Sequence, residues 1–339
     1  MSRFLPVLLT LPLLLATLSS SATERHWQTQ EYTLNQRPLS ELSGLAASGA
    51  HPGYYWAHND SGDRPTLYLI KPGEDKLKSV SVRGASAADW EDMASFSEGD
   101  AHYLLVGDIG DNLAIRPMID IYLLREGGAP QAPSLTLLRR YTLVFDGGPR
   151  DVEGLAVDPE QRMVYLLSKR ERHPKLYRFS LDSLPDEPVL LSALGEIKSL
   201  PTTDSHTPQR KGGITQHSPT GLDFAADGSA AVISTLGESY YFVRQNRQSW
   251  LSVLNTSPQA LGAPPLRQAE SIAISRDGNT ILLGSEGLPT KLLSFQPTSH
   301  LAPQGSHSKR TSAYAPHNKK LAPTTKPPRY NRLGKFTRR

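Results

Sequence analysis

A short pattern that recurs five times is the feature of this sequence that most restricts its fold. The pattern is a polar or acidic residue, a variable residue, Glu, Ser or Thr, a small residue or Asp, an aliphatic residue and usually Ala. The copies begin at Glu41, Asp89, Asp151, Ser218 and Gln268, so that successive copies are 48, 62, 67 and 50 residues apart. Spacings of this size are typical of the repeated blades of a β-propeller with insertions.

Each copy is followed by the same series of local signals: a turn, a short apolar strand, a polar loop, and a strand rich in aromatic residues or leucine. Most copies end in a further, more polar strand, such as 76–82 or 135–145. Four short strands per unit, separated by turn residues, are typical of a propeller blade. We therefore predict an all-β chain, a β-propeller of four-stranded antiparallel blades that spans residues 23–298.

The number of blades follows from the number of copies. We count five, and a sixth is an alternative in 190–217, although 200–217 is rich in Thr, Ser, Pro and Gly and is more typical of a loop insertion. The last copy lacks an outer strand. The segment Gln28–Asn35 has strand character, and we expect it to close the ring by pairing with Leu292–Phe295. A β-sandwich is the alternative fold, and the ordered repeat argues against it.

The N-terminal residues 1–22 have the features of a signal peptide: Arg3, an apolar run from Leu5 to Leu18, and small residues before position 23. The apolar run is shorter than the roughly 20 residues that span a bilayer. We therefore expect an exported protein, periplasmic or secreted, with no transmembrane segment after cleavage. The chain contains no cysteine, which excludes disulfides, a thiolate metal site and a cysteine nucleophile.

The C-terminal residues 299–339 contain ten Lys or Arg residues and no acidic residue, whereas 23–298 carry a net charge of about −7. Few large apolar side chains occur in this tail, so we expect it to be disordered. It could attach the protein to anionic surfaces, or it could be a solvated segment with no partner. We expect no specific nucleic-acid binding, and we expect a monomer.

Acidic residues recur where the innermost strand of each blade begins and where the second strand ends. In a propeller these two positions open onto the same face, so the side chains should converge there. Two neighbouring blades carry the same motif, Asp60-Ser-Gly-Asp63 and Asp108-Ile-Gly-Asp111. The predicted ligands of a divalent cation are Asp60, Asp63, Glu91, Asp108, Asp111, Asn112, Glu153 and Glu270.

Calcium is the expected cation, because it takes six to eight hard oxygen ligands in flexible geometry. Mg²⁺ and Mn²⁺ are alternatives, while Zn²⁺ fits less well because His58 is the only histidine in these loops. The competing interpretation is that the aspartates only form turn hydrogen bonds with their own backbone. Lys169 and Arg170 face the same mouth, where they could bind an anionic substrate group or neutralise nearby acids.

The motifs His58-Asn-Asp-Ser-Gly-Asp63, Asp89-Trp-Glu-Asp92 and Gly107-Asp-Ile-Gly-Asp-Asn112 resemble those of exported bacterial β-propeller proteins of largely uncharacterised function, over roughly 38–298. More distantly, the layout is similar to calcium-dependent propeller hydrolases such as gluconolactonases, paraoxonases and phytase-like proteins. That resemblance implies a metal in the central tunnel, with Glu91, Glu153, Asp108 and Asn112 at ligand positions. Many of those relatives have six blades, and the fourth blade here offers only Thr and Ser.

Two functions follow as hypotheses. The first is a metal-dependent hydrolase of lactones, esters or phosphoesters, in which His58 or a metal-linked carboxylate is the general base. The second is a non-catalytic propeller with structural calcium, whose central funnel holds a small molecule, a glycan or a protein partner. No G-x-S-x-G, P-loop or H-E-x-x-H motif is present, so the sequence offers no unambiguous nucleophile.

Overall fold

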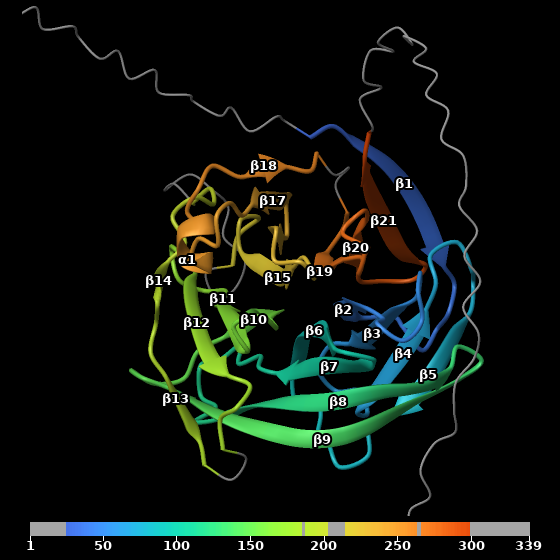
Figure 1. Ribbon diagram of the computed structural model, residues 1–339, viewed down its shortest axis with the longest axis horizontal. Helices are drawn as coiled ribbons and strands as arrows, with labels where there is room; N and C mark the ends of the chain where they lie inside the picture. The colour runs from blue at the N-terminus through green and yellow to red at the C-terminus, as the bar shows by residue number, and fades with distance from the viewer. Residues whose placement is uncertain (1–24, 185–186, 203–213, 263–265, 299–339) are drawn as a thin grey trace, which may run out of the picture. The chain divides into compact units, whose positions relative to one another are not determined.

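A ring of five antiparallel sheets forms the protein, which is therefore a five-bladed β-propeller (Figure 1). The structure is a computed structural model that describes residues 25–184, 187–202, 214–262 and 266–298. The expected signal peptide (1–22) and basic tail (299–339) lie outside the described residues. Within the described residues, no helix is both long enough and apolar enough to cross a membrane.

The four strands of each blade follow one another from the central channel outward. The innermost strands are β2 (Leu42–Ala47), β6 (Trp90–Glu98), β10 (Val152–Asp158), β15 (Pro219–Phe224) and β19 (Ala269–Ile274). The second strands are β3 (Tyr55–Asn59), β7 (Ala101–Asp108), β11 (Met163–Ser168), β16 (Ala230–Thr235) and β20 (Ile281–Ser285). The third strands are β4 (Thr66–Ile70), β8 (Ile119–Ala129), β12 (Lys175–Ser180), β17 (Ser239–Val243) and β21 (Thr290–Pro297). The outer strands are β5 (Leu77–Ser81), β9 (Ala132–Phe145), β14 (Gly195–Glu196), β18 (Gln259–Ala260) and β1 (Trp27–Leu34).

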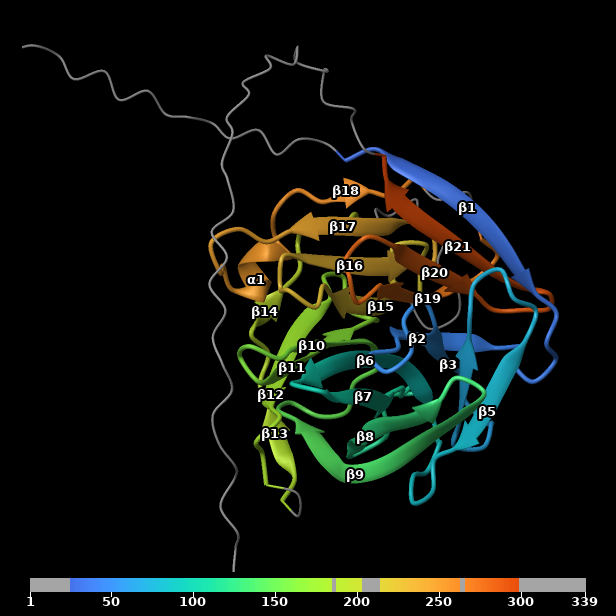
Figure 2. The ribbon, with the colours of Figure 1, turned by 45° about the vertical axis from the view of Figure 1, so that its right-hand side comes forward.

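The N-terminal strand closes the ring, as predicted. Strand β1 pairs antiparallel with β21, from Trp27 opposite Pro297 to Leu34 opposite Thr290. Figure 2 shows the two strands side by side at the edge of the last blade. We number the blades from 1, which begins with β2, to 5, which begins with β19 and ends with β1.

The segment 190–217 adds no sheet of its own within the part of the chain that the structure describes. Instead, β13 (Val189–Leu191) pairs in parallel with β9 at the outer edge of blade 2, and β14 completes blade 3. A short helix, α1 (Trp250–Val253), lies between β17 and β18. The parallel strand β13 and the helix were not expected from the sequence.

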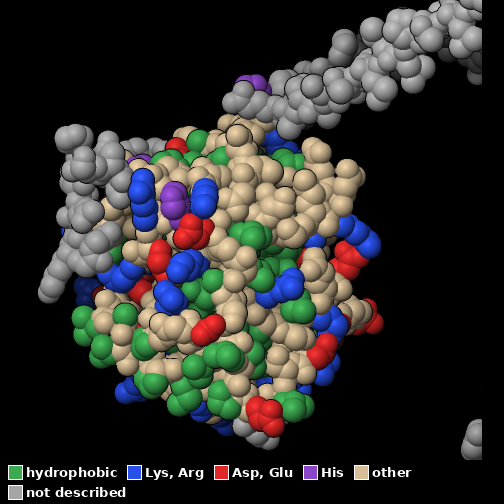
Figure 3. Space-filling model, turned by 90° about the vertical axis from the view of Figure 1, so that its left-hand side faces the viewer, with side chains coloured by type: hydrophobic (Ala, Val, Ile, Leu, Met, Phe, Trp, Pro, Cys, Tyr) green, Lys and Arg blue, Asp and Glu red, His purple; other side chains and the backbone are tan. Residues whose placement is uncertain are grey.

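Apolar side chains fill the space between neighbouring blades. In β10, Leu155 and Val157 pack toward blade 2, whereas Ala156 packs toward blade 4, because successive side chains of a strand point to opposite faces. Trp90 is buried between blades 1 and 2, and its Nε1 donates a hydrogen bond to the carbonyl of Ser86 at 2.8 Å. On the side of the molecule shown in Figure 3, Lys and Arg side chains lie among Asp and Glu side chains. The apolar core lies between neighbouring blades.

Candidate metal centre at the channel mouth

A β-bulge occurs at the same place in all five innermost strands. In each strand the register against the second strand shifts by one residue near the start. The extra residues are Ser43, Glu91, Glu153, Thr220 and Glu270. They are the third residues of the five repeated patterns. Because a bulge re-aims a side chain, the repeat directs a Glu, Ser or Thr to the same level of the channel in every blade. We call these five residues the bulge ring.

Two groups of three carboxylates lie at this level. Asp60, Asp89 and Glu91 each offer one oxygen, and these oxygens lie within 4.8 Å of one another. Glu91, Asp151 and Glu153 form a second such group. Asp60 and Asp89 are half-buried, whereas Glu91, Asp151 and Glu153 are buried. The first group, which we call the outer carboxylate group, is therefore the one that a solvated cation could reach.

Gly110, inside the motif Asp108-Ile-Gly-Asp111, leaves space for the outer carboxylate group. A Cβ atom at Gly110 would lie 2.2 Å from Glu91 Oε1 and 2.5 Å from Asp89 Oδ2. Both distances are far shorter than van der Waals contact. The backbone N–H groups of Ile109 and Gly110 donate to the carbonyl of Asp89 at 3.1 Å, which holds the loop against this residue. Only glycine at this position allows the two carboxylates to remain where they are.

Basic side chains neutralise the acids on the blade 3 side of the mouth. Lys169 Nζ lies 2.7 Å from Glu153 Oε1, and both side chains are buried. Arg170 forms an ion pair with Asp151. In contrast, Asp60, Asp89 and Glu91 form no ion pair with Lys or Arg in the described part of the chain. The inner group is therefore in direct ion-pair contact with basic side chains, whereas Lys169 and Arg116 act on the outer group only at longer range.

Burial and mutual repulsion raise the pKa values of the carboxyl groups here. Burial, followed by the charges of Asp60 and Asp151, raises the pKa of Asp89 to about 6. Burial and then the charge of Glu153 hold the pKa of Glu91 well above its usual range. Burial raises the pKa of Glu153 to about 8 although Lys169 opposes the change. Each of these acids would release a proton more readily if a cation were bound nearby.

Four of the expected metal ligands are already held by hydrogen bonds or ion pairs to other residues of the protein, Asp63 and Asp111 within their own loops. The carboxylate of Asp63 accepts from the backbone N–H of Arg64 and from Asn59 Nδ2, both at 2.7 Å. The carboxylate of Asp111 accepts from the backbone N–H groups of Ile115 and Arg116 at 2.9 and 2.8 Å.

Asp108 accepts from the backbone N–H groups of Ala88 and Asp89 and forms an ion pair with Arg116 at 2.8 Å. Asn112 is exposed, and its amide oxygen accepts from Arg170. The structure thus gathers Asp60, Glu91 and Glu153 into the carboxylate groups and leaves Asp63, Asp108, Asp111 and Asn112 outside them.

Glu270 belongs to the bulge ring but to neither carboxylate group. It is half-buried, and its charge raises the pKa of Glu153, Lys169 and Glu286. Glu286, on the loop after β20, has a pKa raised by burial and then by Glu270 to about 7. The acidic field therefore extends from blade 2 across the mouth to blade 5.

His58 lies in the core. Its side chain is fully buried, its ring centroid is 5.5 Å from that of Trp90, and a Cβ atom at Gly44 would lie 2.0 Å from Nε2. Its Nδ1 is 2.9 Å from the carbonyl oxygen of Asn59. Burial lowers the pKa of His58 to about 4. The imidazole is thus neutral at pH 7 and has no solvent-exposed surface.

The list of expected ligands omitted Asp89 and Asp151, although both begin a copy of the repeated pattern. That first position was the signal that could have identified them. Asp92, in the same pattern, has a different role. It is fully buried and its carboxylate accepts from the backbone N–H groups of Met93, Leu155 and Leu222 at 2.8, 2.8 and 3.0 Å. Asp92 thereby joins the innermost strands of blades 2, 3 and 4.

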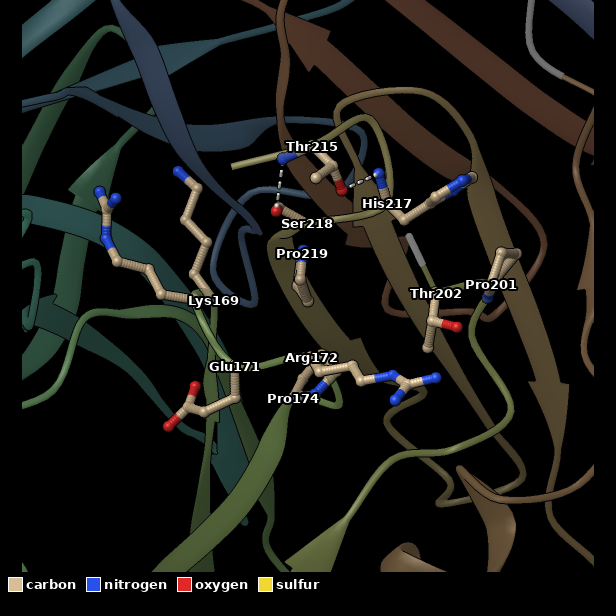
Figure 4. A pocket seen from close by; sticks show the side chains of 11 residues that line it. Lys169, Glu171, Arg172, Pro174, Pro201, Thr202, Thr215, His217, Ser218 and Pro219 are labelled. Carbon is tan, nitrogen blue, oxygen red and sulfur yellow. Dashed lines mark hydrogen bonds between the residues drawn. The ribbon is translucent and has the colours of Figure 1, made fainter. Parts of the chain in front are cut away.

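A pocket of about 340 Å³ adjoins the mouth between blades 3 and 4. Lys169 and Arg170 line it together with Arg172 and His217. Figure 4 shows Arg172 and His217 on one side and Lys169 on the other. Arg172 is exposed and forms no ion pair among the described residues. The pocket, which we call the basic pocket, shares Lys169 with the carboxylate field.

No known family model and no curated protein matches this chain in comparisons of sequence.

Proposed function

We propose that the protein binds a divalent cation at Asp60, Asp89 and Glu91, with Ca²⁺ as the expected ion. The bound cation would allow the protein to bind and hydrolyse a small lactone, ester or phosphoester. The observation that carries the proposal is the outer carboxylate group. Three carboxylate oxygens from two blades lie within 4.8 Å of one another, and no Lys or Arg of the described residues forms an ion pair with them. Like charges this close are costly unless protons or a cation compensate them.

The donor set fits a hard cation. Three carboxylates supply part of the six to eight oxygens that Ca²⁺ takes, which leaves positions for water and a ligand oxygen. Mg²⁺ and Mn²⁺ also prefer oxygen donors and are the alternatives. A bound cation would polarise the carbonyl or phosphoryl oxygen of a ligand. For an exported protein, a dissociation constant of about 10⁻⁴–10⁻³ M would be sufficient, as in extracellular calcium modules.

The remaining chemistry would come from residues around the mouth. Arg172 and Lys169 in the basic pocket would orient an anionic group of the ligand. Proton transfer needs a group whose pKa lies near the working pH, and Glu286, which is not one of the three ligands and has a pKa of about 7, meets this condition. His58 would take no part in proton transfer, because its side chain has no exposed surface.

A direct experiment measures hydrolysis of a panel of lactones, aryl esters and phosphoesters by the wild-type chain, with Ca²⁺ and after chelation. We expect turnover of at least one class, lost on chelation and restored by Ca²⁺. Thermal unfolding is recorded in the same samples. If Ca²⁺ neither stabilises the fold nor changes any rate, the cation site is wrong.

The second candidate is a non-catalytic propeller with structural calcium. The observation that favours it is that Lys169, Arg170 and Arg116 are already paired with Glu153, Asp151 and Asp108. These pairs stabilise the mouth and leave few free polar groups for catalysis. Calcium-dependent stabilisation without turnover on any substrate of the panel would select this candidate.

A further inference from the structure

The basic pocket has walls that the fold holds in place. Its lining comes from three chain segments, namely the loop after β11 (169–174), residues after β14 (201–202) and residues up to the start of β15 (215–219). The backbone N–H of Ser218 donates to the carbonyl of Thr215 at 3.0 Å, and the N–H of Thr215 donates to Ser218 Oγ at 3.1 Å. The carbonyl of Pro174 accepts from the N–H of Ile197 at 2.8 Å. The volume of about 340 Å³ lies within the range of about 300–1,000 Å³ that is usual for small-molecule sites.

The basic side chains of this pocket differ in whether the protein itself already pairs them. Lys169 forms an ion pair with Glu153, and Arg170 forms one with Asp151. Arg172, in contrast, is exposed and forms neither an ion pair nor a side-chain hydrogen bond within the described residues. A guanidinium group carries five N–H donors in a planar arrangement that matches the paired oxygens of a carboxylate or a phosphate. Arg172 is therefore the arginine that can bind a ligand without losing a partner among the described residues.

The acidic residue of the basic pocket is held away from Arg172. Glu171 is the only acid among the described residues that line the pocket, and its Oε1 lies 3.0 Å from Nη1 of Arg150. Figure 4 shows the side chains of Glu171 and Arg172 extending in opposite directions, with Arg172 on the side of Thr202 and His217. That side of the pocket thus offers a positive charge, a hydroxyl and an imidazole, and no carboxylate. Such a set of groups favours an oxyanion over a neutral or cationic group.

Lys169 connects the basic pocket to the proposed cation site. Its side chain lines the pocket, and its charge opposes the rise in the pKa values of Asp60 and Glu91 in the outer carboxylate group. The pocket therefore begins where the carboxylate field ends. The acids of the mouth would repel an anionic ligand, whereas a bound cation and Arg172 would each attract it. A ligand with two oxygen groups, one for each of these positions, fits this distribution of charge.

We propose that the ligand of the mouth carries a free acid group, a carboxylate or a phosphate, which binds to Arg172 in the basic pocket while the reacting oxygen of the ligand binds to the cation. This inference rests on the proposed function, because it requires the cation and the pocket to act on one molecule. It narrows the substrates to those with a free acid group and makes Arg172 the residue that determines this selectivity. Because Arg172 would contact the acid group and not the reacting bond, its loss should raise KM more than it lowers kcat.

The first experiment compares pairs of esters that differ only at the end of the acyl chain. The 4-nitrophenyl half-esters of adipate and suberate end in a carboxylate, and the 4-nitrophenyl esters of hexanoate and octanoate end in a methyl group. With Ca²⁺ present, we expect the wild type to show a kcat/KM about tenfold higher for the better half-ester than for its neutral counterpart. Arg172→Gln removes the charge and should abolish most of this preference, mainly through KM. Arg247→Gln, at an exposed arginine that pairs with Glu160 outside the pocket, is the matched control and should keep the preference.

The second experiment measures the pocket without the cation and without turnover. Phosphate and acetate are titrated by calorimetry, in chelator, into the wild type and both variants, whose thermal midpoints show that they remain folded. We expect at least one of the two anions to bind, Arg172→Gln to weaken that binding about tenfold, and Arg247→Gln to leave it unchanged. The anion that binds more tightly identifies the acid group as a phosphate or a carboxylate.

The two experiments distinguish failure of this inference from failure of the proposed function. If the half-esters and the neutral esters are hydrolysed equally well in a Ca²⁺-dependent reaction, the inference is overturned and the proposed function stands. If no ester of either kind is hydrolysed, the proposed function loses its support from esters, and the titrations decide about the pocket. Anion binding that depends on Arg172 would then support the pocket as an anion site. Binding that is absent, or that Arg172→Gln leaves unchanged, would overturn the inference.

Discussion

Glu91→Gln is the substitution that most sharply tests the carboxylate groups, because Glu91 belongs to both of them. The change removes one negative charge and keeps the shape of the side chain. The new amide can donate hydrogen bonds to the carboxylates around it, so the variant gains partners for its buried donors. A residue with only a packing role would tolerate this change without any dependence on metal.

The magnitude follows from the spacing. Two unit charges 4.8 Å apart repel by about 3.5 kcal/mol at an effective dielectric constant of about 20. Proton uptake relieves part of this repulsion, since burial and Glu153 hold the pKa of Glu91 well above its usual range. We therefore expect the metal-free variant to be more stable than the metal-free wild type by about 1–3 kcal/mol.

Calcium should reverse this order. At a free concentration one hundred times the dissociation constant, binding adds about 2.7 kcal/mol to the wild type. That free energy corresponds to a rise in Tm of roughly 5–10 °C for a domain of this size. The variant lacks one of three carboxylate ligands and should gain little. The two proteins would thus exchange their order of stability at high Ca²⁺, because a thousandfold excess over the dissociation constant adds about 4.1 kcal/mol to the wild type.

Denaturant unfolding at pH 8, in chelator and at several Ca²⁺ concentrations, measures both states. Glu160→Gln is the matched control, because Glu160 is an exposed glutamate in the turn between β10 and β11, at the other end of the channel. It should follow the wild type in both conditions. A Glu91→Gln protein that is less stable than the wild type in chelator, or that responds fully to Ca²⁺, would refute the reasoning.

Three further predictions concern the same mouth. Calorimetry should show that Ca²⁺ binds more weakly as the pH falls from about 8 to 5, and that binding releases protons. The reason is that Asp89 and Glu91 have raised pKa values and must ionise to act as ligands. A Ca²⁺ affinity that is independent of pH would contradict this prediction. Gly110→Ala should lower both the thermal midpoint and the Ca²⁺ affinity, because its Cβ would lie within 2.5 Å of two carboxylate oxygens. The control Gly99→Ala lies in an open turn, so it should leave the Ca²⁺ affinity unchanged even if it lowers the thermal midpoint. Lys169→Met should lower the free energy of unfolding by about 3–5 kcal/mol above pH 8, where Glu153 is ionised in the wild type. The loss should be smaller at lower pH, where a proton on Glu153 replaces the lost ammonium charge. Urea unfolding at pH 6 and pH 9 measures this difference.

The pH dependence of the metal-free fold has a definite sign. A carboxyl whose pKa is raised on folding binds a proton more tightly in the folded chain than in the unfolded chain. Its contribution is therefore greatest at low pH and is lost as the pH rises through the folded value. For Asp89 and Glu153 these values are about 6 and about 8. The metal-free protein should lose stability between about pH 4, the unfolded value, and about pH 8, the higher folded value, and Ca²⁺ should reduce that loss.

The blades could be predicted from the sequence because their signals are local. Apolar residues alternate within short segments, turn residues separate the segments, and the pattern repeats. Closure of the ring by β1 followed from counting, since one blade lacked an outer strand. Strand β13 could not be predicted, because a strand of three residues is too short to show an alternation of apolar and polar side chains. Its parallel pairing with β9 depends on how the chain passes between blades.

The site could be predicted only in part. The third position of the repeat identified Glu91, Glu153 and Glu270, because the same bulge places them at one level in every blade. The sequence could not distinguish Asp60, whose carboxylate joins Asp89 and Glu91, from Asp63, whose carboxylate binds its own loop. That difference depends on the path of each loop. The burial of His58 against Gly44 likewise depends on contacts between strands that no local pattern records.

Lys169 determines where a cation could bind at this mouth. Burial by itself would lower the pKa of its ammonium group, yet the charges of Glu153, Glu270 and Glu91 outweigh burial and keep it protonated. The ammonium thus serves as a fixed positive charge for the inner carboxylates. Because it is tethered to blade 3, it forms its ion pair with Glu153 and none with Asp60 or Asp89. The same acidic field therefore contains one part that the chain neutralises itself and another part, the outer carboxylate group, where a cation from solution would supply the missing charge.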